Sequence, residues 1–124
     1  MSFYHKHLLI NATVKNPIID AKLCEKWFRD LVDLIDMKVL VEPKAVYCNT
    51  DGNEGVTGTV VIETSHASVH IWSKADPAYL RMDVYSCKDF EVKDVVAFLD
   101  ETMSIIDHDI MVIDRNNTKL SIMS

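Results

Sequence analysis

Hydrophobic residues recur along this chain with two spacings, one typical of helices and the other typical of strands. Between residues 17 and 36 they lie three or four positions apart, which predicts an amphipathic helix with Asn16 as its N-cap and Pro17 in its first turn. The apolar face of this helix consists of Leu23, Cys24, Trp27, Phe28, Leu31, Leu34 and Ile35. A second helix is predicted to begin near Asp89, and its apolar face consists of Val92, Val95, Val96, Leu99 and Met103.

Six other segments have the alternating or valine-rich patterns of strands: 5–13, 38–49, 56–63, 66–73, 79–86 and 110–114. The polar stretch NTDGNEG at residues 49–55 is the clearest loop. Four of the strands lie between the two helices. This order predicts an α+β fold, a two-layer sandwich in which two helices cover one face of a mostly antiparallel sheet. We expect residues 1–124 to form a single domain.

Composition narrows the class of protein. Hydrophobic residues make up 48% of the 124 residues and charged residues 26%, as in soluble globular chains rather than disordered ones. The net charge of −6 argues against a nucleic-acid partner, and no apolar run approaches the length that spans a membrane. Three widely spaced cysteines favour free thiols in a reducing compartment, so a cytoplasmic location is expected.

The segment SHASVHIW, residues 65–72, contains the most unusual pattern of polar residues. In a strand, alternate residues share a face, so His66, Ser68, His70 and Trp72 are predicted to lie on one face of the sheet. His66 and His70 would then be about 13 Å apart along the strand. Zinc–nitrogen bonds are only about 2.0–2.1 Å long, so the two imidazoles would not share an ion and no metal site is predicted.

From the pattern alone, two interpretations of this polar face remain open. It is either a sheet surface covered by a partner or a loop, or a polar pocket on the exposed side of the sheet.

The segments GVTGTVVIETSHASVHIW and MDVYSC together resemble the small prokaryotic S-adenosylmethionine decarboxylase proenzymes. Members of that family have a hydroxyl residue before a V-V-I strand, then S-H-x-x-x-H-x-W, then D-x-x-x-C. The resemblance extends over residues 5–114, with the helices in the expected order.

The resemblance implies self-cleavage at the Thr64–Ser65 bond. Ser65 Oγ would attack the carbonyl carbon of Thr64 to form an ester, and β-elimination and hydrolysis would leave a pyruvoyl group derived from Ser65. His70 and the Thr57 hydroxyl would assist this processing. The pyruvoyl group would bind a substrate amine as a Schiff base and accept electrons as carbon dioxide leaves.

Further roles follow from the same resemblance. Cys87 would reprotonate the product, and Trp72 and His66 would contact the substrate, Trp72 by offering a flat face to adenine or to the sulfonium cation. The family generally forms homodimers with sites near the interface, so a homodimer is expected.

Three positions depart from the family pattern. Thr64 stands where the family has glutamate, and its β-branched side chain is expected to alter strain at the bond to be cleaved. Ser73-Lys74 replaces the Pro-Glu that follows the tryptophan, and Asp76 is the nearest carboxylate that could contact ribose instead. The loop at residues 49–55 lacks an aromatic residue, which makes Tyr47 the nearest candidate for stacking on adenine.

Three hypotheses therefore remain. The first is an S-adenosylmethionine decarboxylase-like enzyme of polyamine synthesis. The second is an unprocessed, non-enzymatic relative that binds a nucleoside, an amine metabolite or a partner protein through the same face. The third is a pyruvoyl-dependent decarboxylase of another amino acid. The sequence does not assign a role to Lys74.

Overall fold

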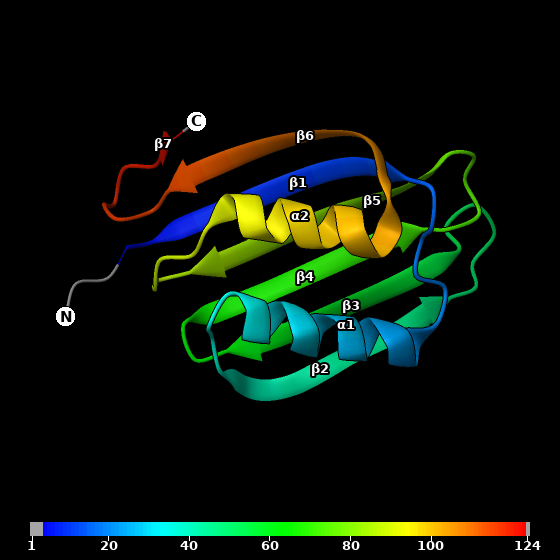
Figure 1. The fold of residues 1–124 in the computed structure, drawn as a ribbon, viewed down its shortest axis with the longest axis horizontal. Coiled ribbons are helices and arrows are strands. Elements are labelled where there is room, and N and C mark those ends of the chain that lie inside the picture. The colour runs from blue at the N-terminus through cyan, green and yellow to red at the C-terminus, as the bar shows by residue number, and fades with distance from the viewer. Residues whose placement is uncertain (1–3, 124) are drawn as a thin grey trace.

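The computed structural model describes residues 4–123, which form seven strands and two helices (Figure 1). The strands are β1 (Lys6–Val14), β2 (Val39–Cys48), β3 (Gly55–Ile62), β4 (Ser65–Trp72), β5 (Ala78–Ser86), β6 (Ile105–Asp114) and β7 (Ser121–Ile122). The helices are α1 (Ala21–Leu34), between β1 and β2, and α2 (Val92–Met103), between β5 and β6. In this part of the chain neither helix is long and apolar enough to cross a membrane.

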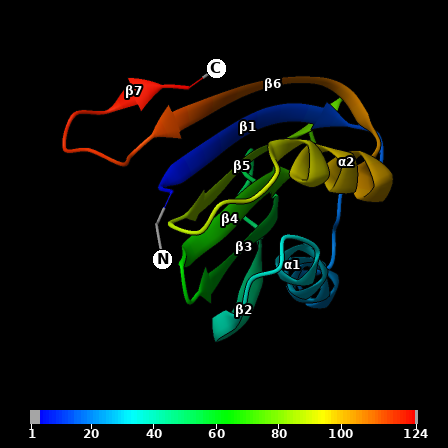
Figure 2. The ribbon, with the colours of Figure 1, turned by 60° about the vertical axis from the view of Figure 1, so that its left-hand side comes forward.

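The strands form one antiparallel sheet in the order β2-β3-β4-β5-β1-β6-β7. Strands β2 to β5 are neighbours in sequence order, whereas β1 is inserted between β5 and β6. Figures 1 and 2 show both helices on the same side of the sheet, which leaves its other face open. The predicted two-layer α+β fold is confirmed.

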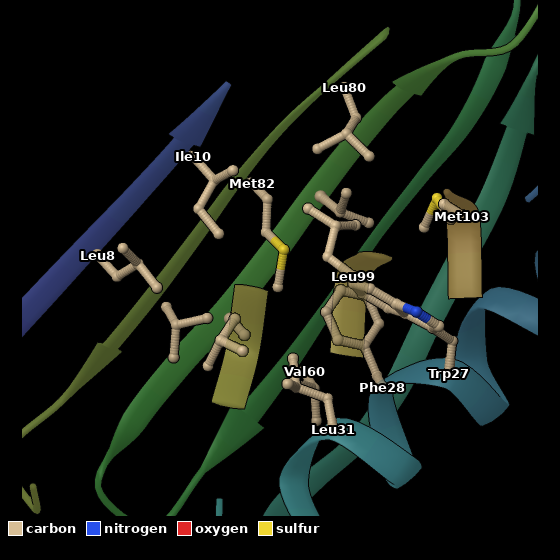
Figure 3. Close-up of a cluster of buried hydrophobic side chains, with 14 of the residues drawn as sticks. Leu8, Ile10, Trp27, Phe28, Leu31, Val60, Leu80, Met82, Leu99 and Met103 are labelled. Atoms are coloured by element: carbon tan, nitrogen blue, oxygen red, sulfur yellow. The ribbon is translucent and has the colours of Figure 1, made fainter. Parts of the chain in front are cut away.

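The hydrophobic core lies between the helices and the sheet face they cover (Figure 3). Strand alternation supplies one side of it, as in β4, where Ala67, Val69 and Ile71 are buried. Helix α1 contributes Trp27, whose ring packs edge-on against Phe28 with centroids 5.1 Å apart. The indole Nε1 of Trp27 also donates a hydrogen bond to Thr102 Oγ1 at 2.8 Å, which joins the two helices.

Element boundaries differ from the prediction at several places. Helix α1 begins at Ala21, because the side chain of Asp20 accepts a hydrogen bond from the Lys22 amide at 2.8 Å and caps the helix. The prediction of Asn16 as N-cap is wrong. Its side chain instead donates to Ser104 Oγ at 3.0 Å. Helix α2 begins at Val92 rather than near Asp89.

Strand β6 starts at Ile105, five residues before the predicted start of the last strand. The charged and polar residues at 107–109 are exposed and interrupt the hydrophobic alternation, although their backbone pairs with β1. The two-residue strand β7 was not predicted, because a polar tail carries no strand pattern of its own.

We predict that Gly58→Ala lowers the free energy of unfolding by about 1–3 kcal/mol through overpacking. A Cβ atom at residue 58 would lie 2.9 Å from Cys24 Sγ and 3.0 Å from Phe28 Cε2, where β3 packs directly on α1. The measurement is chemical denaturation of Gly58→Ala, Cys24→Ala and the double variant. The double variant should be less destabilised than the sum of the singles, because Cys24→Ala removes one clashing atom. Strictly additive effects would contradict this account.

Candidate active site

The predicted polar face of β4 lies on the open side of the sheet, opposite the helices. His66, Ser68 and Trp72 are half-buried there, and His70 is exposed. Since β5 pairs with β4 and β1 pairs with β5, side chains of all three strands meet on this face. The predicted alternation of β4 is confirmed.

The Thr64–Ser65 bond lies at the tight turn that joins β3 to β4. Ser65 has φ of 153°, a backbone conformation that residues with a side chain rarely adopt. Such conformations cost on the order of 1–3 kcal/mol and persist only where the surrounding structure enforces them. The backbone on the C-terminal side of the Thr64–Ser65 bond is therefore strained, while the effect expected of the β-branched Thr64 side chain stays a prediction.

The carbonyl group of Thr64 is held from the end of β5. The backbone N–H of Cys87 donates a hydrogen bond to the Thr64 carbonyl oxygen at 3.0 Å. This oxygen is the one that would gain negative charge if Ser65 Oγ attacked the carbonyl carbon, and a fixed amide donor stabilises such charge.

The three cysteines occupy different environments. Cys24 is buried in the core, and burial raises the pKa of its thiol to about 12. Cys48 ends β2, where hydrogen bonds from the backbone and side chain of Thr50 lower the pKa of its thiol. Cys87 alone among the three lies next to the Thr64–Ser65 bond, where its amide contacts Thr64.

Thr57 and His70 form a second group. They are opposite one another on β3 and β4, and Thr57 Oγ1 lies 3.2 Å from His70 Nδ1. His70 is five residues from Ser65 along β4, which corresponds to roughly 16 Å. Within one chain, the predicted catalytic residues are therefore divided between the two ends of β4.

A third group of polar residues lies on the open face, and the sequence did not predict its assembly. His7 Nε2 lies 2.7 Å from Asp83 Oδ2, and His66 Nε2 lies 3.4 Å from the same oxygen. Ser68 Oγ donates to the other oxygen of Asp83. Burial by itself would raise the pKa of Asp83, but hydrogen bonds from Ser68 and His7 and the two imidazoles outweigh it, so the pKa is lowered.

The ligand atoms of His7, His66 and Asp83 lie within 4.8 Å of one another, so the group is compact enough to be considered as a metal site. Arg115 Nη1, however, lies 3.2 Å from His7 Nδ1 and can only donate. His7 then carries its proton on Nε2 and donates it to Asp83. The geometry favours a hydrogen-bonded network over a set of metal ligands, since a metal bound at Nε2 requires that nitrogen to be unprotonated.

Trp72 lies at the far end of β4 from Ser65. Its ring is stacked on Tyr79 with centroids 4.8 Å apart, and its Nε1 donates to Asn53 Oδ1 at 2.7 Å. A hollow of about 160 Å³ adjoins this pair, and its walls are formed by Gly52, Glu54, Trp72, Lys74, Ala75 and Tyr79.

The residues around this hollow are only partly those that the sequence singled out, and the substrate contacts expected for Trp72, Asp76 and Tyr47 stay predictions. The sequence analysis did not single out Tyr79, whose ring covers one face of Trp72. The two residues are cross-strand partners on β4 and β5, and this pairing was the signal that could have identified Tyr79. Glu54 and Lys74 line the hollow, whereas Asp76 is exposed in the loop between β4 and β5. Tyr47 is exposed on β2, at the position paired with Val56.

Comparisons with known proteins identify the family and the fold. A model of the S-adenosylmethionine decarboxylase family matches residues 6–116. S-adenosylmethionine decarboxylase proenzymes from the Hall, Langeland and Loch Maree strains of Clostridium botulinum are 33% identical over 51 residues, which are 40% of this chain and 42% of theirs. The matched segment thus spans less than half of these relatives. The crystal structure of the adenosylmethionine decarboxylase from Aquifex aeolicus VF5 has the same fold, with a TM-score of 0.73, 19% identity and 96% of each chain covered.

We predict that Asp83→Asn destabilises the fold at neutral pH by about 1–3 kcal/mol, because it removes the charge that Ser68 and His7 stabilise. A carboxylate whose pKa is lowered by folding contributes stability above its unfolded pKa of about 4, and that contribution is lost as the pH falls through the folded pKa. Unfolding free energies from pH 7 down to pH 3, measured beside the exposed control Asp109→Asn, test this. A difference between wild type and Asp83→Asn that stays constant over this range would contradict it.

Proposed function

The chain belongs to the S-adenosylmethionine decarboxylase family, and we propose that it is a self-cleaving, pyruvoyl-dependent decarboxylase of polyamine synthesis. The observation that carries the proposal is the geometry of the Thr64–Ser65 bond. A strained serine follows a carbonyl group whose oxygen already accepts a hydrogen bond from the Cys87 amide. Both features favour attack at that carbonyl.

The proposed cleavage uses atoms of this chain and water. Ser65 Oγ attacks the Thr64 carbonyl carbon, the C–N bond breaks, and the nitrogen of residue 65 takes up a proton, which leaves an ester. β-Elimination then frees the carboxylate of Thr64 and converts residue 65 to dehydroalanine. Hydrolysis releases ammonia and leaves a pyruvoyl group at the start of the second fragment. The residues at the turn fit the formation of this group, because Ser65 supplies its carbon atoms.

The pyruvoyl group, when formed, supplies a carbonyl that accepts electrons as carbon dioxide leaves the substrate. Among this chain's own residues, the Cys87 Sγ proton is the proposed source for reprotonating the product, since residue 87 is adjacent to residue 65 in the fold. The free thiols of the chain support a reducing, cytoplasmic location.

We further propose a homodimer in which two copies of the chain meet through their open sheet faces. His70 is roughly 16 Å from Ser65 along β4. It and its partner Thr57 on β3 are therefore too far away to move a proton at Ser65 of the same chain. An antiparallel pair of sheets would bring the Thr57–His70 group of one copy to the Thr64–Ser65 bond of the other. Apolar side chains on the open face support this, because Leu9, Val46 and Met111 are exposed there.

The proposed substrate is S-adenosylmethionine. The hollow beside Trp72 presents a carboxylate and an ammonium group, Glu54 and Lys74. The third hypothesis, decarboxylation of another amino acid, is tested by comparing S-adenosylmethionine with simple amino acids as substrates.

We predict that the purified protein converts from a single 14.1 kDa species into two fragments, residues 1–64 and 65–124. Denaturing mass spectrometry follows the conversion, and the second fragment should resist Edman degradation because its first residue is a pyruvoyl group. Ser65→Ala is the control and should stay intact. If the wild type also stays intact after prolonged incubation, the chain is the unprocessed binding protein of the second hypothesis.

We predict that two inactive variants complement each other. In Ser65→Ala the bond lacks its nucleophile, and in His70→Ala the proton-transfer group is missing. When the two are co-expressed, the His70→Ala chain should be cleaved, because its Ser65 meets the intact His70 of the other copy. The chain carrying both substitutions, co-expressed with His70→Ala, is the control and should give no cleavage. Cleavage of His70→Ala by itself, or failure of complementation, would contradict the two-copy site.

A further inference from the structure

Ser86 is a polar residue that is buried inside the fold. Within residues 4–123 it is the one polar residue that is fully buried, and it is the last residue of β5, directly before Cys87. A buried hydroxyl is costly unless each of its hydrogen-bonding groups has a partner. The hydrogen-bond partners of Ser86 therefore indicate which groups it positions.

One of these partners is Thr64, the residue directly before the bond that is proposed to break. Ser86 Oγ lies 2.9 Å from Thr64 Oγ1, and it also contacts both the carbonyl oxygen and the amide of Lys88, at 2.8 Å and 3.0 Å. A hydroxyl has one proton. When Ser86 donates to Lys88, the contact with Thr64 is therefore made by the Thr64 hydroxyl donating to Ser86.

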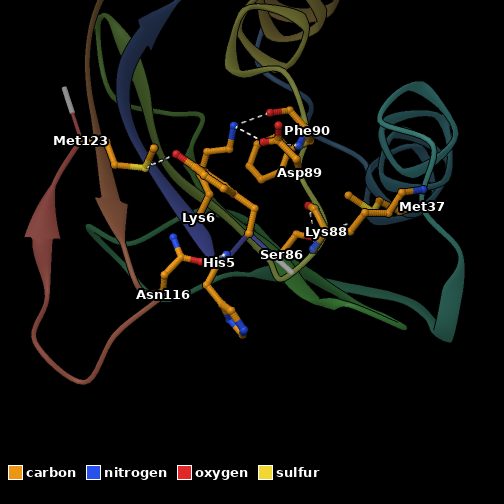
Figure 4. A network of polar contacts seen from close by, with 10 residues as sticks. His5, Lys6, Met37, Ser86, Lys88, Asp89, Phe90, Asn116 and Met123 are labelled. Carbon is orange, nitrogen blue, oxygen red and sulfur yellow. Dashed lines mark hydrogen bonds and ion pairs between the residues drawn. The ribbon is translucent and has the colours of Figure 1, made fainter. Parts of the chain in front are cut away.

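A third segment of the chain also contacts the Thr64 side chain, which is half-buried. Thr64 Oγ1 lies 3.4 Å from Met37 Sδ, and Met37 follows α1, where its amide donates to Val32 at 3.0 Å. Figure 4 shows Met37, Ser86 and Lys88 gathered at this end of the sheet. Lys88 Nζ also donates to the Asp36 carbonyl at 2.8 Å, which ties the end of β5 to the same loop.

We propose that the Ser86 hydroxyl is a positioning residue for self-cleavage, acting through Thr64. Thr64 is fixed twice from consecutive residues of one segment: Ser86 holds its side chain, and the Cys87 amide holds its carbonyl oxygen. The two contacts set both the rotation of the Thr64 carbonyl and its distance from the Cys87 N–H. This inference rests on the proposed function, and it adds a role for the threonine that departs from the family pattern.

The alternative is that Ser86 only shapes the turn into Lys88, through its contacts with that residue. The two roles differ in what Thr64 does. If Ser86 acts through Thr64, removal of either hydroxyl weakens the same contact, so the effects of Ser86→Ala and Thr64→Val on cleavage must be coupled. If Ser86 only shapes the turn, Thr64→Val leaves cleavage unchanged, because valine keeps the shape of threonine.

The experiment measures the rate of cleavage of wild type, Ser86→Ala, Thr64→Val and the double variant by denaturing mass spectrometry. Each single variant should cleave between about 10-fold and 100-fold more slowly, since small misplacements of reacting groups cost this much. The double variant should be little slower than the slower single. Thr102→Val, which removes a hydroxyl that joins the two helices on the other side of the sheet from the open face, is the control and should cleave at the wild-type rate.

A second measurement does not depend on cleavage. In the uncleavable Ser65→Ala background, hydrogen exchange at the Cys87 amide reports the bond to the Thr64 carbonyl. Adding Ser86→Ala or Thr64→Val should accelerate that exchange by about tenfold or more, with the amides of the β1–β5 ladder unchanged. Unchanged exchange at Cys87, or multiplicative effects of the two substitutions on the cleavage rate, would overturn the inference. A wild type that never cleaves would overturn the proposed function, while the exchange measurement would still decide whether Ser86 fixes the Thr64 carbonyl.

Discussion

The register of β4 between β3 and β5 is the constraint on which the rest of this structure depends. It pairs Ser65 with Ser86 and thereby brings the β3–β4 turn against the end of β5, where the Cys87 amide meets the Thr64 carbonyl. Side chains in a strand alternate between faces, so a slip of one residue would expose Val69 and bury His70. The apolar contacts of β4 with the helices therefore fix the position of the polar bond at its end.

Much of this arrangement could be predicted from local patterns. The alternation of SHASVHIW defines which residues of β4 face the core, and the valine-rich neighbours define the antiparallel sheet. What could not be predicted depends on strands that are distant in sequence. His7 meets Asp83 and His66 because β1 is inserted beside β5, and no local pattern indicates where an N-terminal strand will pair. Competition between nearby caps also decides details, as where Asp20 rather than Asn16 caps α1.

The same geometry separates the residues that are predicted to be catalytic. Thr57 on β3 contacts His70 on β4, and this pair lies toward the opposite end of β4 from Ser65. A motif read along one strand suggests neighbours, whereas the rise of about 3.3 Å per residue separates its ends. In the proposed homodimer, the imidazoles, hydroxyls and exposed apolar side chains of the open face would be complemented by those of the second copy.

The strand order also determines what cleavage at residue 64 would do to the fold. The first fragment would carry β1, α1, β2 and β3, and the second would carry β4, β5, α2, β6 and β7. Because β1 lies between β5 and β6, the fragments would be interleaved and could not separate without breaking two complete ladders as well as the β3–β4 pairing. Breaking the bond would release the constraint on the Ser65 backbone and leave the core intact. The fold therefore does not depend on the Thr64–Ser65 bond. The strained backbone at this turn can be cleaved while the strands on either side stay paired.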